Sequence, residues 1–89
     1  MAIKFSRNFR KQHTKAGEKI RRAFRNRLNL FQQNPLDPQL RDHPLKGEYE
    51  GYRSINVTGD WRAIYSKRKK EDDDVIVFEL LGTHSELYN

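Results

Sequence analysis

The sequence predicts an α+β fold in which two N-terminal helices pack on one face of a small antiparallel sheet, in the order β-α-α-β-β-β. Apolar residues recur at helical spacing in the first half of the chain and alternate with period two in the second half. The helices also precede most of the strands, as is typical of two-layer folds. Eighty-nine residues leave no room for a second core, so we expect one domain over residues 1–89.

The chain begins with a predicted short strand and a short helix. Within residues 2–6, Ile3 and Phe5 alternate with a lysine, which favours a strand. Ser6 has a side chain that commonly caps helices, so a helix is expected over residues 7–14. Gly17 then predicts a break.

A second, longer helix is predicted from residue 16 or 18 to residue 33. Its large apolar residues are spaced four, four and three apart, so they form one stripe on a helix, while most of its arginines lie off that stripe. Asn34 and Pro35 end the helix, because the residue before a proline avoids helical geometry. The stripe consists of Ile20, Phe24, Leu28 and Phe31.

The second half predicts a loop followed by a three-stranded meander. Residues 35–51 hold all three prolines and read as a loop. Residues 52–57 alternate, with Ser54 and Asn56 on the face opposite the apolar one, and "TGD" is a hairpin turn signal. A strand over residues 61–67, a charged turn over 68–74 and a buried central strand over 75–81 follow.

The charge distribution points to an anionic partner. Residues 1–34 carry ten Lys or Arg and one acid, whereas the rest carry eight basic and eleven acidic residues. Such asymmetry favours a nucleic-acid or acidic-protein surface, although a solvated basic helix face has the same composition. The chain has no cysteine, no signal-peptide core and no apolar run long enough to span a membrane, so we expect a cytoplasmic protein without membrane contact.

Three candidate side chains could carry chemistry. His43 lies in a proline-bounded loop, Asp60 lies in the hairpin turn, and His84 follows the last strand. No spacing typical of a metal site, phosphate loop or hydrolase nucleophile is present, so we expect no metal and no cofactor. Histidines and a carboxylate beside a basic surface suit metal-free RNA cleavage, because histidine can both take and give a proton near neutral pH.

Two blocks of sequence resemble the YafQ branch of the RelE-type toxins. They are "DHPLKGEYEGYRSINVTGDWRAIY", residues 42–65, and "FELLGTHSELY", residues 78–88. The resemblance implies a RelE-like fold and a ribosome-dependent, metal-independent mRNA endonuclease that acts in the ribosomal A site, beside rRNA. It also implies a cognate antitoxin, with a toxin that is monomeric alone and hetero-oligomeric with its antitoxin.

The resemblance also implies roles for individual residues. His43, Asp60 and His84 match the family's catalytic positions, and His84 is the candidate general acid. The candidates for RNA contact are Asn56, Trp61, Arg62 and Tyr88. Trp61 and Tyr88 match aromatic positions of the family, and Tyr88 could stack on a base, whereas Arg62 stands where the wider RelE family often has an arginine that serves the phosphate. Without these roles, Asp60 would bond only its own turn, Arg62 would face solvent, and the final residues would form a frayed tail.

One position departs from the family. The branch's best-known toxin has a histidine where Asn56 stands, and an amide cannot exchange protons at neutral pH. We expect activity if His43 or Asp60 supplies the base. Two alternatives stay open: a non-enzymatic toxin on the same fold, such as a ParE-like gyrase inhibitor, and an inactive RNA- or ribosome-binding module.

Overall fold

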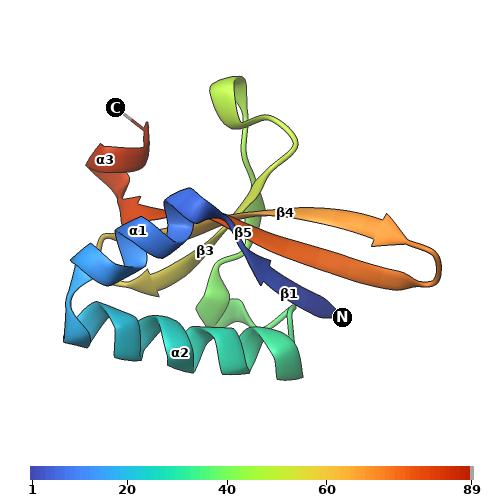
Figure 1. The fold of residues 1–89 in the computed structure, drawn as a ribbon, viewed down its shortest axis with the longest axis horizontal. Helices are drawn as coiled ribbons and strands as arrows, with labels where there is room; N and C mark the ends of the chain where they lie inside the picture. Colours follow the sequence, from blue (N-terminus) through green and yellow to red (C-terminus); the bar gives the residue numbers. More distant parts are fainter. Residues whose placement is uncertain (89) are drawn as a thin grey trace.

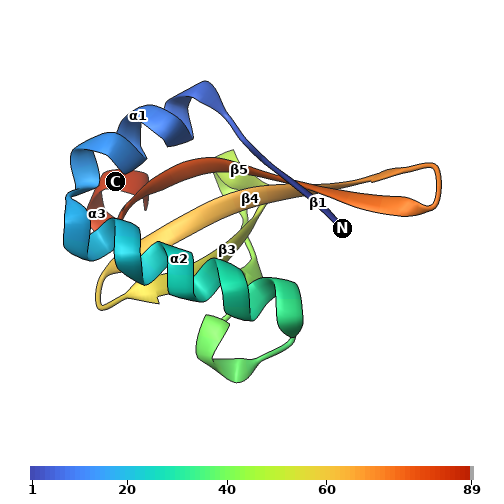
Figure 2. The same ribbon diagram turned by 60° about the horizontal axis from the view of Figure 1, so that its bottom comes forward.

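The structure is a computed structural model that describes residues 1–88, and it confirms the α+β class. Two helices cover one face of a five-stranded sheet whose strand order is β1-β5-β4-β3-β2 (Figures 1 and 2). The elements are β1 (Ala2–Phe5), α1 (Arg7–Ala16), α2 (Glu18–Gln33), η1 (Pro38–Leu40), β2 (His43–Pro44), η2 (Gly47–Tyr49), β3 (Arg53–Thr58), β4 (Trp61–Lys70), β5 (Asp73–Thr83) and α3 (His84–Tyr88).

The sheet differs from the predicted antiparallel meander in three ways. β1 pairs with β5 in parallel, so the sheet is mixed. The two-residue strand β2 adds an edge beside β3, inside the segment predicted to be loop. β4 and β5 also extend through most of the charged segment, so that only Glu71 and Asp72 separate them and their hairpin projects from the molecule (Figure 1). The predicted central strand is confirmed, because β5 lies between β1 and β4.

Both long helices begin and end where local sequence signals place them. The Ser6 hydroxyl accepts a hydrogen bond from the Phe9 amide at 3.0 Å and so caps α1. Gly17 separates the helices with φ of 93°, a conformation that favours glycine. The amide of Asn34 closes α2 on the Leu30 carbonyl at 2.7 Å. None of the helices in residues 1–88 has the length and apolar character to cross a membrane.

The core lies between these helices and the sheet, with aromatic rings at its centre. Phe78 of β5 is fully buried, and its ring centroid lies 5.2 Å from that of Phe24 and 5.8 Å from that of Phe9. Burying one such ring stabilises the fold by about 1.5–3 kcal/mol. α1 packs mainly on β5 and α2 on β3, so the helices fix the sheet from one side.

The second face of the sheet carries polar side chains, as the alternation in β3 predicts. Ser54 and Asn56 point to this face, and Asn56 lies opposite Arg62 of β4 in the strand register. The loop of residues 45–52 and α3 stand together at the top of Figure 1, on the side away from α2. The fold therefore leaves this face to a loop, a short helix and polar strand residues.

Candidate active site

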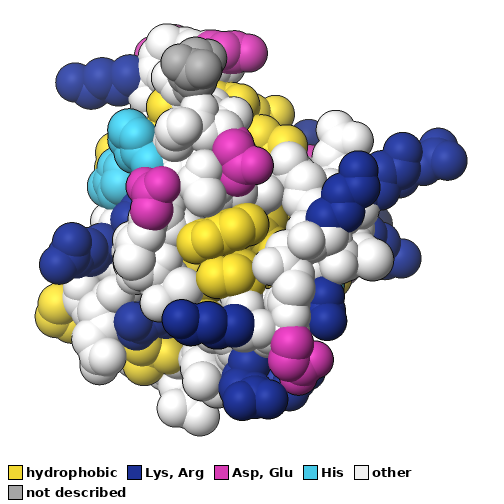
Figure 3. All heavy atoms as spheres, turned by 90° about the vertical axis from the view of Figure 1, so that its left-hand side faces the viewer, with side chains coloured by type: hydrophobic (Ala, Val, Ile, Leu, Met, Phe, Trp, Pro, Cys, Tyr) yellow, Lys and Arg dark blue, Asp and Glu magenta, His cyan; other side chains and the backbone are white. Residues whose placement is uncertain are grey.

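Four of the predicted site residues line one pocket. His43, Arg62, His84 and Tyr88, with Leu45, surround a space of about 320 Å³. They come from β2, β4 and α3, which are far apart in the sequence. In the space-filling view of Figure 3, histidine side chains form one group at an edge, with Lys and Arg side chains on either side. The pocket thus combines two imidazoles, a guanidinium and a phenol.

A buried serine, Ser54, fixes the Arg62 side chain by hydrogen bonds. Arg62 Nε donates to Ser54 Oγ at 2.8 Å, and its Nη2 donates to the carbonyl oxygens of Ser54 and Arg41, each at 3.2 Å. Burial lowers the pKa of Arg62, but a guanidinium stays protonated at neutral pH. The hydrogen bonds described above use Nε and Nη2, which leaves Nη1 as the guanidinium nitrogen for an anion in the pocket that Arg62 lines.

The imidazole of His43 has one nitrogen tied to the backbone. Its Nδ1 lies 2.9 Å from the Arg41 carbonyl oxygen and 3.2 Å from Arg62 Nη2. Arg62 Nη2 already donates to two carbonyl oxygens, those of Arg41 and Ser54, and the Arg41 carbonyl can only accept, so we assign the proton of neutral His43 to Nδ1, which donates to Arg41. Nε2 then carries the lone pair, which is the form a general base needs.

The backbone conformation of Arg41 directs its carbonyl oxygen toward both of these side chains. Arg41 ends η1 in the left-handed region, with φ of 47° and ψ of 41°. A non-glycine residue adopts this conformation at a cost of about 1 kcal/mol or more. The Arg41 carbonyl accepts hydrogen bonds from both His43 and Arg62. The strained residue therefore fixes the distance between the candidate general base, His43, and the cation, Arg62.

A clamp on Asp42 fixes the same loop to the sheet. Asp42 Oδ1 accepts from Arg53 Nε at 2.8 Å, and Oδ2 accepts from the Tyr65 hydroxyl. Burial and the bond to Asp42 raise the pKa of Tyr65, so its hydroxyl stays protonated and donates. The clamp thereby fixes the backbone on both sides of Asp42, including His43, which lines the pocket.

α3 brings His84 and Tyr88 together at i and i+4. Their ring centroids are 4.7 Å apart, with planes tilted by 57°. The Tyr88 hydroxyl donates to Ser54 Oγ at 3.2 Å, so it meets the same serine as Arg62. The His84 amide donates to the Asp60 carbonyl at 3.0 Å and ties α3 to the β3–β4 turn.

A capping box starts this helix. The Thr83 amide donates to Glu86 Oε1 at 2.8 Å, and the Glu86 amide donates to Thr83 Oγ1 at 3.3 Å. These bonds to Thr83 lower the pKa of the Glu86 carboxyl. Gly82, near the end of β5, lies against α3. A Cβ at this position would come within 3.3 Å of Leu87, so the glycine lets α3 pack closely on the strand end.

Three further predicted residues do not line the pocket. The Asp60 side chain is exposed in its turn, and only its carbonyl reaches α3. Asn56 lies opposite Arg62 in the sheet, with Nδ2 directed to the Gly59 carbonyl at 3.4 Å. Trp61 packs against the helix-side core and borders a different pocket, beside α1.

Ser54, Asp42, Tyr65 and Arg41 were not predicted as site residues. Two of these residues could have been found from the sequence. Ser54 lies on the polar face of the predicted strand, and Asp42 directly precedes His43. Nothing in the sequence indicates the left-handed backbone of Arg41 or the partner of Tyr65. Within residues 1–88, no three His, Cys, Asp or Glu side chains lie close enough together to hold a metal ion.

Comparison with known proteins gives both sequence and structural relatives. The mRNA interferase toxin YafQ of Escherichia coli K12 is 43% identical over 54 residues, which are 61% of this chain and 54% of that protein. A putative YafQ toxin of Haemophilus influenzae is 35% identical over 57 residues, which are 64% of this chain and 56% of the relative. The chain thus spans about half the length of the curated relatives it matches.

Solved structures match over nearly the whole chain. The crystal structure of YafQ from E. coli BL21(DE3) superposes with a TM-score of 0.75 at 28% identity, covering 98% of this chain and 97% of that one. YafQ in the E. coli DinJ–YafQ toxin–antitoxin complex gives a TM-score of 0.68 at 28% identity, covering 98% and 96%. A YoeB/ParE toxin from Agrobacterium tumefaciens gives 0.75 at 15% identity, covering 94% and 99%, and shows the fold alone.

The family assignment rests on the full chain. The family described as the bacterial toxin of type II toxin–antitoxin systems, YafQ, matches residues 1–89. The α+β topology agrees with it, because the YafQ crystal structure superposes over 98% of this chain. The chain therefore belongs to the YafQ family of bacterial toxins.

Proposed function

We propose that this protein is the toxin of a type II toxin–antitoxin pair and cleaves mRNA in the ribosomal A site without a metal ion. The observation that carries the proposal is the joint placement of His43, Arg62, His84 and Tyr88 around one pocket. Two imidazoles and a cation are the groups that metal-free RNA cleavage needs. The E. coli relatives are mRNA interferase toxins, which supports the same reaction class.

In the proposed reaction, His43 Nε2 takes the proton of the RNA 2′-hydroxyl. The 2′-oxygen attacks the adjacent phosphorus, and the bond from phosphorus to the 5′-oxygen breaks. His84 protonates that leaving oxygen, so the products carry a 2′,3′-cyclic phosphate and a 5′-hydroxyl. Arg62 Nη1 stabilises the charge that grows on the phosphate, and Tyr88 stacks on a neighbouring base.

Asp60, Trp61 and Asn56 are proposed to act on the RNA from the rim. The bond between the Asp60 carbonyl and His84 keeps the β3–β4 turn beside the general acid, so the exposed carboxylate can approach bound mRNA. Asn56 can donate to a phosphate or base from its place opposite Arg62. Trp61 would meet RNA or rRNA at the helix side of the same sheet end.

The proposed partner is an antitoxin with an acidic segment. The DinJ–YafQ complex of E. coli shows a structural relative bound to its antitoxin. In this chain, exposed Lys19, Arg22 and Arg25 lie along α2 and offer a basic surface to such a segment. Both the ribosomal target and the antitoxin place the proposed action in the cytoplasm.

The test is cleavage of a defined mRNA in a purified translation system, read by primer extension. We expect cuts inside the reading frame that depend on ribosomes, vanish in His84→Ala and leave cyclic phosphate ends. Leu36→Ala, at a residue that is 89% exposed and does not line the pocket, is the control and should cut normally. Intact mRNA in this system, together with DNA breaks in a parallel assay with purified gyrase and plasmid DNA, would instead establish the ParE-like alternative. Ribosome binding without cleavage would establish the binding module.

A further inference from the structure

A row of aromatic rings leads away from the proposed active site over the sheet face that carries Ser54. His84 stacks near Tyr88, as described above, and the Tyr88 ring lies 6.1 Å from that of Tyr49, edge to face. The Tyr49 ring lies 6.4 Å from that of Tyr52. The rings are tilted against one another rather than coplanar, and aromatic side chains of this kind can each pack on the flat face of a base.

The far end of this row borders a second pocket. Its volume is about 380 Å³, larger than that of the His43 pocket. Tyr49 and Tyr52 form one side, Arg7 and Asn8 of α1 form the other, and apolar and acidic strand residues form the floor. The complete lining is Ser6, Arg7, Asn8, Tyr49, Tyr52, Ile64, Glu79 and Leu80.

The loop that carries the two tyrosines is held by its own backbone. The Tyr52 amide donates to the Tyr49 carbonyl at 3.0 Å, and the Leu45 amide donates to the Tyr52 carbonyl at 2.9 Å. A further bond from the Glu50 amide to the Gly47 carbonyl, at 3.1 Å, closes η2. Rigid aromatic rings bind flat ligands with little loss of conformational entropy, so the loop is prepared for stacking.

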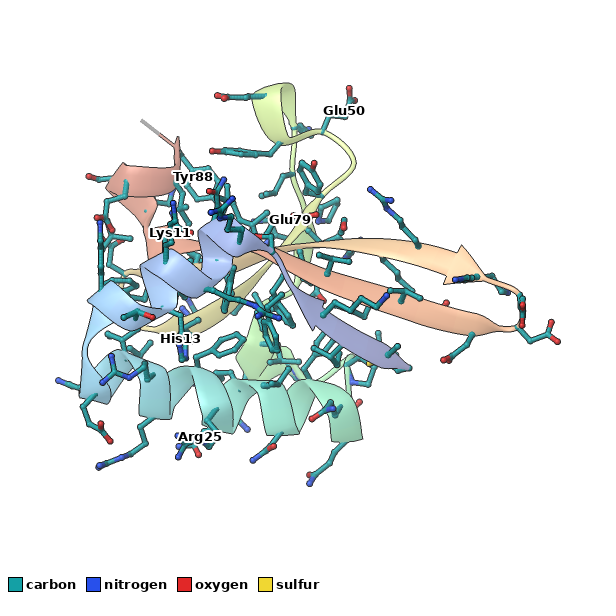
Figure 4. All side chains as sticks on the ribbon, viewed as in Figure 1. Lys11, His13, Arg25, Glu50, Glu79 and Tyr88 are labelled. Carbon is teal, nitrogen blue, oxygen red and sulfur yellow. The ribbon has the colours of Figure 1, made fainter. Side chains whose placement is uncertain are left out.

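The chemistry of this second pocket fits an unpaired nucleotide. The tyrosine rings and Leu80 offer flat apolar surface for a base, and exposed Arg7 offers a cation for its phosphate at the rim. Glu79, which Figure 4 labels between α1 and the loop, disfavours a phosphate at the floor and can accept from a base amino group. The polar groups therefore orient the base inward and the phosphate outward.

We propose that the pocket between Tyr49, Tyr52 and Arg7 binds an unpaired mRNA nucleotide that flanks the cut. The inference rests on the proposed function, because it assigns a flank of the same RNA substrate. It makes the loop and the start of α1 part of substrate recognition. The enzyme then reads sequence or shape beyond the scissile pair, at a site that lies outside the His43 pocket.

The experiment measures binding of short RNAs to the free toxin by fluorescence anisotropy. Each RNA has a 2′-deoxy nucleotide at the cut and is extended stepwise, by one nucleotide at a time, on its 5′ or its 3′ side. We expect one direction of extension to tighten binding by the wild type. Tyr49→Ala and Tyr52→Ala should each lose roughly 5- to 100-fold of that gain, the range for one stacked base. Tyr49→Phe should keep it.

Two further variants keep the test decisive. Arg7→Glu changes an exposed residue, so it should fold normally and weaken the extended RNA more than the unextended one. Leu36→Ala removes an apolar side chain that is 89% exposed elsewhere and should bind every RNA as the wild type does. Equal gains from extension in wild type, Tyr49→Ala and Arg7→Glu would overturn the flanking site.

Failure of the flanking site and failure of the proposed function give different results. If the wild type cuts mRNA on ribosomes and His84→Ala does not, while the tyrosine variants match the wild type in both assays, only the flanking site is wrong. If the wild type neither cuts mRNA nor binds any of the RNAs, both proposals are wrong. A raised toxin concentration for half-maximal cutting in Tyr49→Ala, at unchanged maximal rate, would support binding rather than chemistry at this pocket.

Discussion

Ser54 holds Arg62 through two of its oxygens. Its Oγ accepts from Arg62 Nε at 2.8 Å, and its carbonyl accepts from Nη2 at 3.2 Å. The same Oγ lies 3.2 Å from the Tyr88 hydroxyl, and the serine itself is fully buried. One buried hydroxyl oxygen thus accepts from both side chains, so Ser54 links the position of the proposed phosphate ligand to that of the proposed stacking residue.

The first prediction is that Ser54→Ala lowers the rate of RNA cleavage at least tenfold. The substitution leaves Arg62 Nε without its partner and should cost about 1–3 kcal/mol of the free energy of unfolding. Single-turnover cleavage and urea unfolding measure the two effects. Ser66→Ala is the control, because Ser66 is also buried on the sheet but bonds Glu79. Similar rates in the two variants would contradict the positioning role.

The second prediction concerns the shape of the Arg62 side chain. Arg62→Lys keeps the charge, but an ammonium cannot bond Ser54 and Arg41 and still present a free nitrogen to the phosphate. We expect a loss of roughly 100-fold or more in the cleavage rate, close to that of Arg62→Ala. Arg68→Lys, at an exposed position on the same strand, should cut as the wild type does. Full activity of Arg62→Lys would show that charge alone is needed.

The third prediction is that Asp42→Asn loosens the loop that carries His43. The carboxylate accepts from Arg53 and Tyr65, and hydrogen bonds to a charged group contribute about 1.5–3 kcal/mol. We expect a loss of that size in urea unfolding, together with slower cleavage. Asp37→Asn is the control, since Asp37 only caps η1 through the Gln39 amide and asparagine caps as well. Slow cleavage that persists at saturating RNA would identify misplacement of His43 rather than weaker binding.

Much of the fold followed from local pattern, and the exceptions have physical causes. The stripe from Ile20 to Phe31 and the break at Gly17 predicted α2 closely, because both signals act within one helix. The alternation of Ile3 and Phe5 predicts a strand but not its partner, so the parallel pairing with β5 was missed. Residues 68–74 lack apolar side chains, yet backbone pairing and the facing charges of Lys67 and Asp74, 3.7 Å apart, continue the hairpin.

The residues that line the pocket were predicted, whereas the residues that support them were missed. His43, Arg62, His84 and Tyr88 could be named because their blocks resemble a family, but their shared contact with Ser54 or Arg41 depends on tertiary structure. α3 is too short for a periodic signal over its five residues. Its sequence signal was the capping box "THSE", in which Thr83 and Glu86 bond each other.

The fourth prediction is a loss of stability on mild acidification that depends on His13. This side chain lies between α1 and α2 (Figure 4), where burial, then Arg21 and Arg25, lower its pKa. Arg10 faces the same space and adds positive charge, and no acid lines it among the described residues. The unfolded state, with a histidine pKa of about 6.5, therefore binds more protons than the folded state just below that pH.

The free energy of unfolding should accordingly fall as the pH drops through about 6.5. His13→Gln removes this contribution, so its stability should depend less steeply on pH between 7.5 and 5.5. Urea unfolding at several pH values measures both curves. Lys15→Gln, at an exposed position on the same helix, controls for the loss of a basic residue and should keep the slope of the wild type. Parallel curves for wild type and His13→Gln would contradict the prediction.

The fifth prediction is that Asn56→His raises the cleavage rate. Asn56 lies opposite Arg62 on β3, so an imidazole there would stand on the same face as the proposed phosphate ligand. Only the weak contact from Nδ2 to the Gly59 carbonyl, at 3.4 Å, is lost, so stability should change by less than about 1 kcal/mol. General base catalysis contributes roughly 100- to 10,000-fold, and a clear gain would show that this base is missing in the wild type.

The double variant Asn56→His with His43→Ala separates two sources of the base. If His43 already acts through Nε2, His43→Ala alone should remove most cleavage, and a histidine at position 56 should restore part of it. If a histidine at 56 adds nothing in either background, the loop imidazole held by Arg41 is sufficient. Asn56→Gln, which keeps an amide but cannot exchange protons, should cut no faster than the wild type. Single-turnover rates measured from pH 5.5 to 8.5 would then show whether the added imidazole changes the proton-dependent step rather than RNA binding.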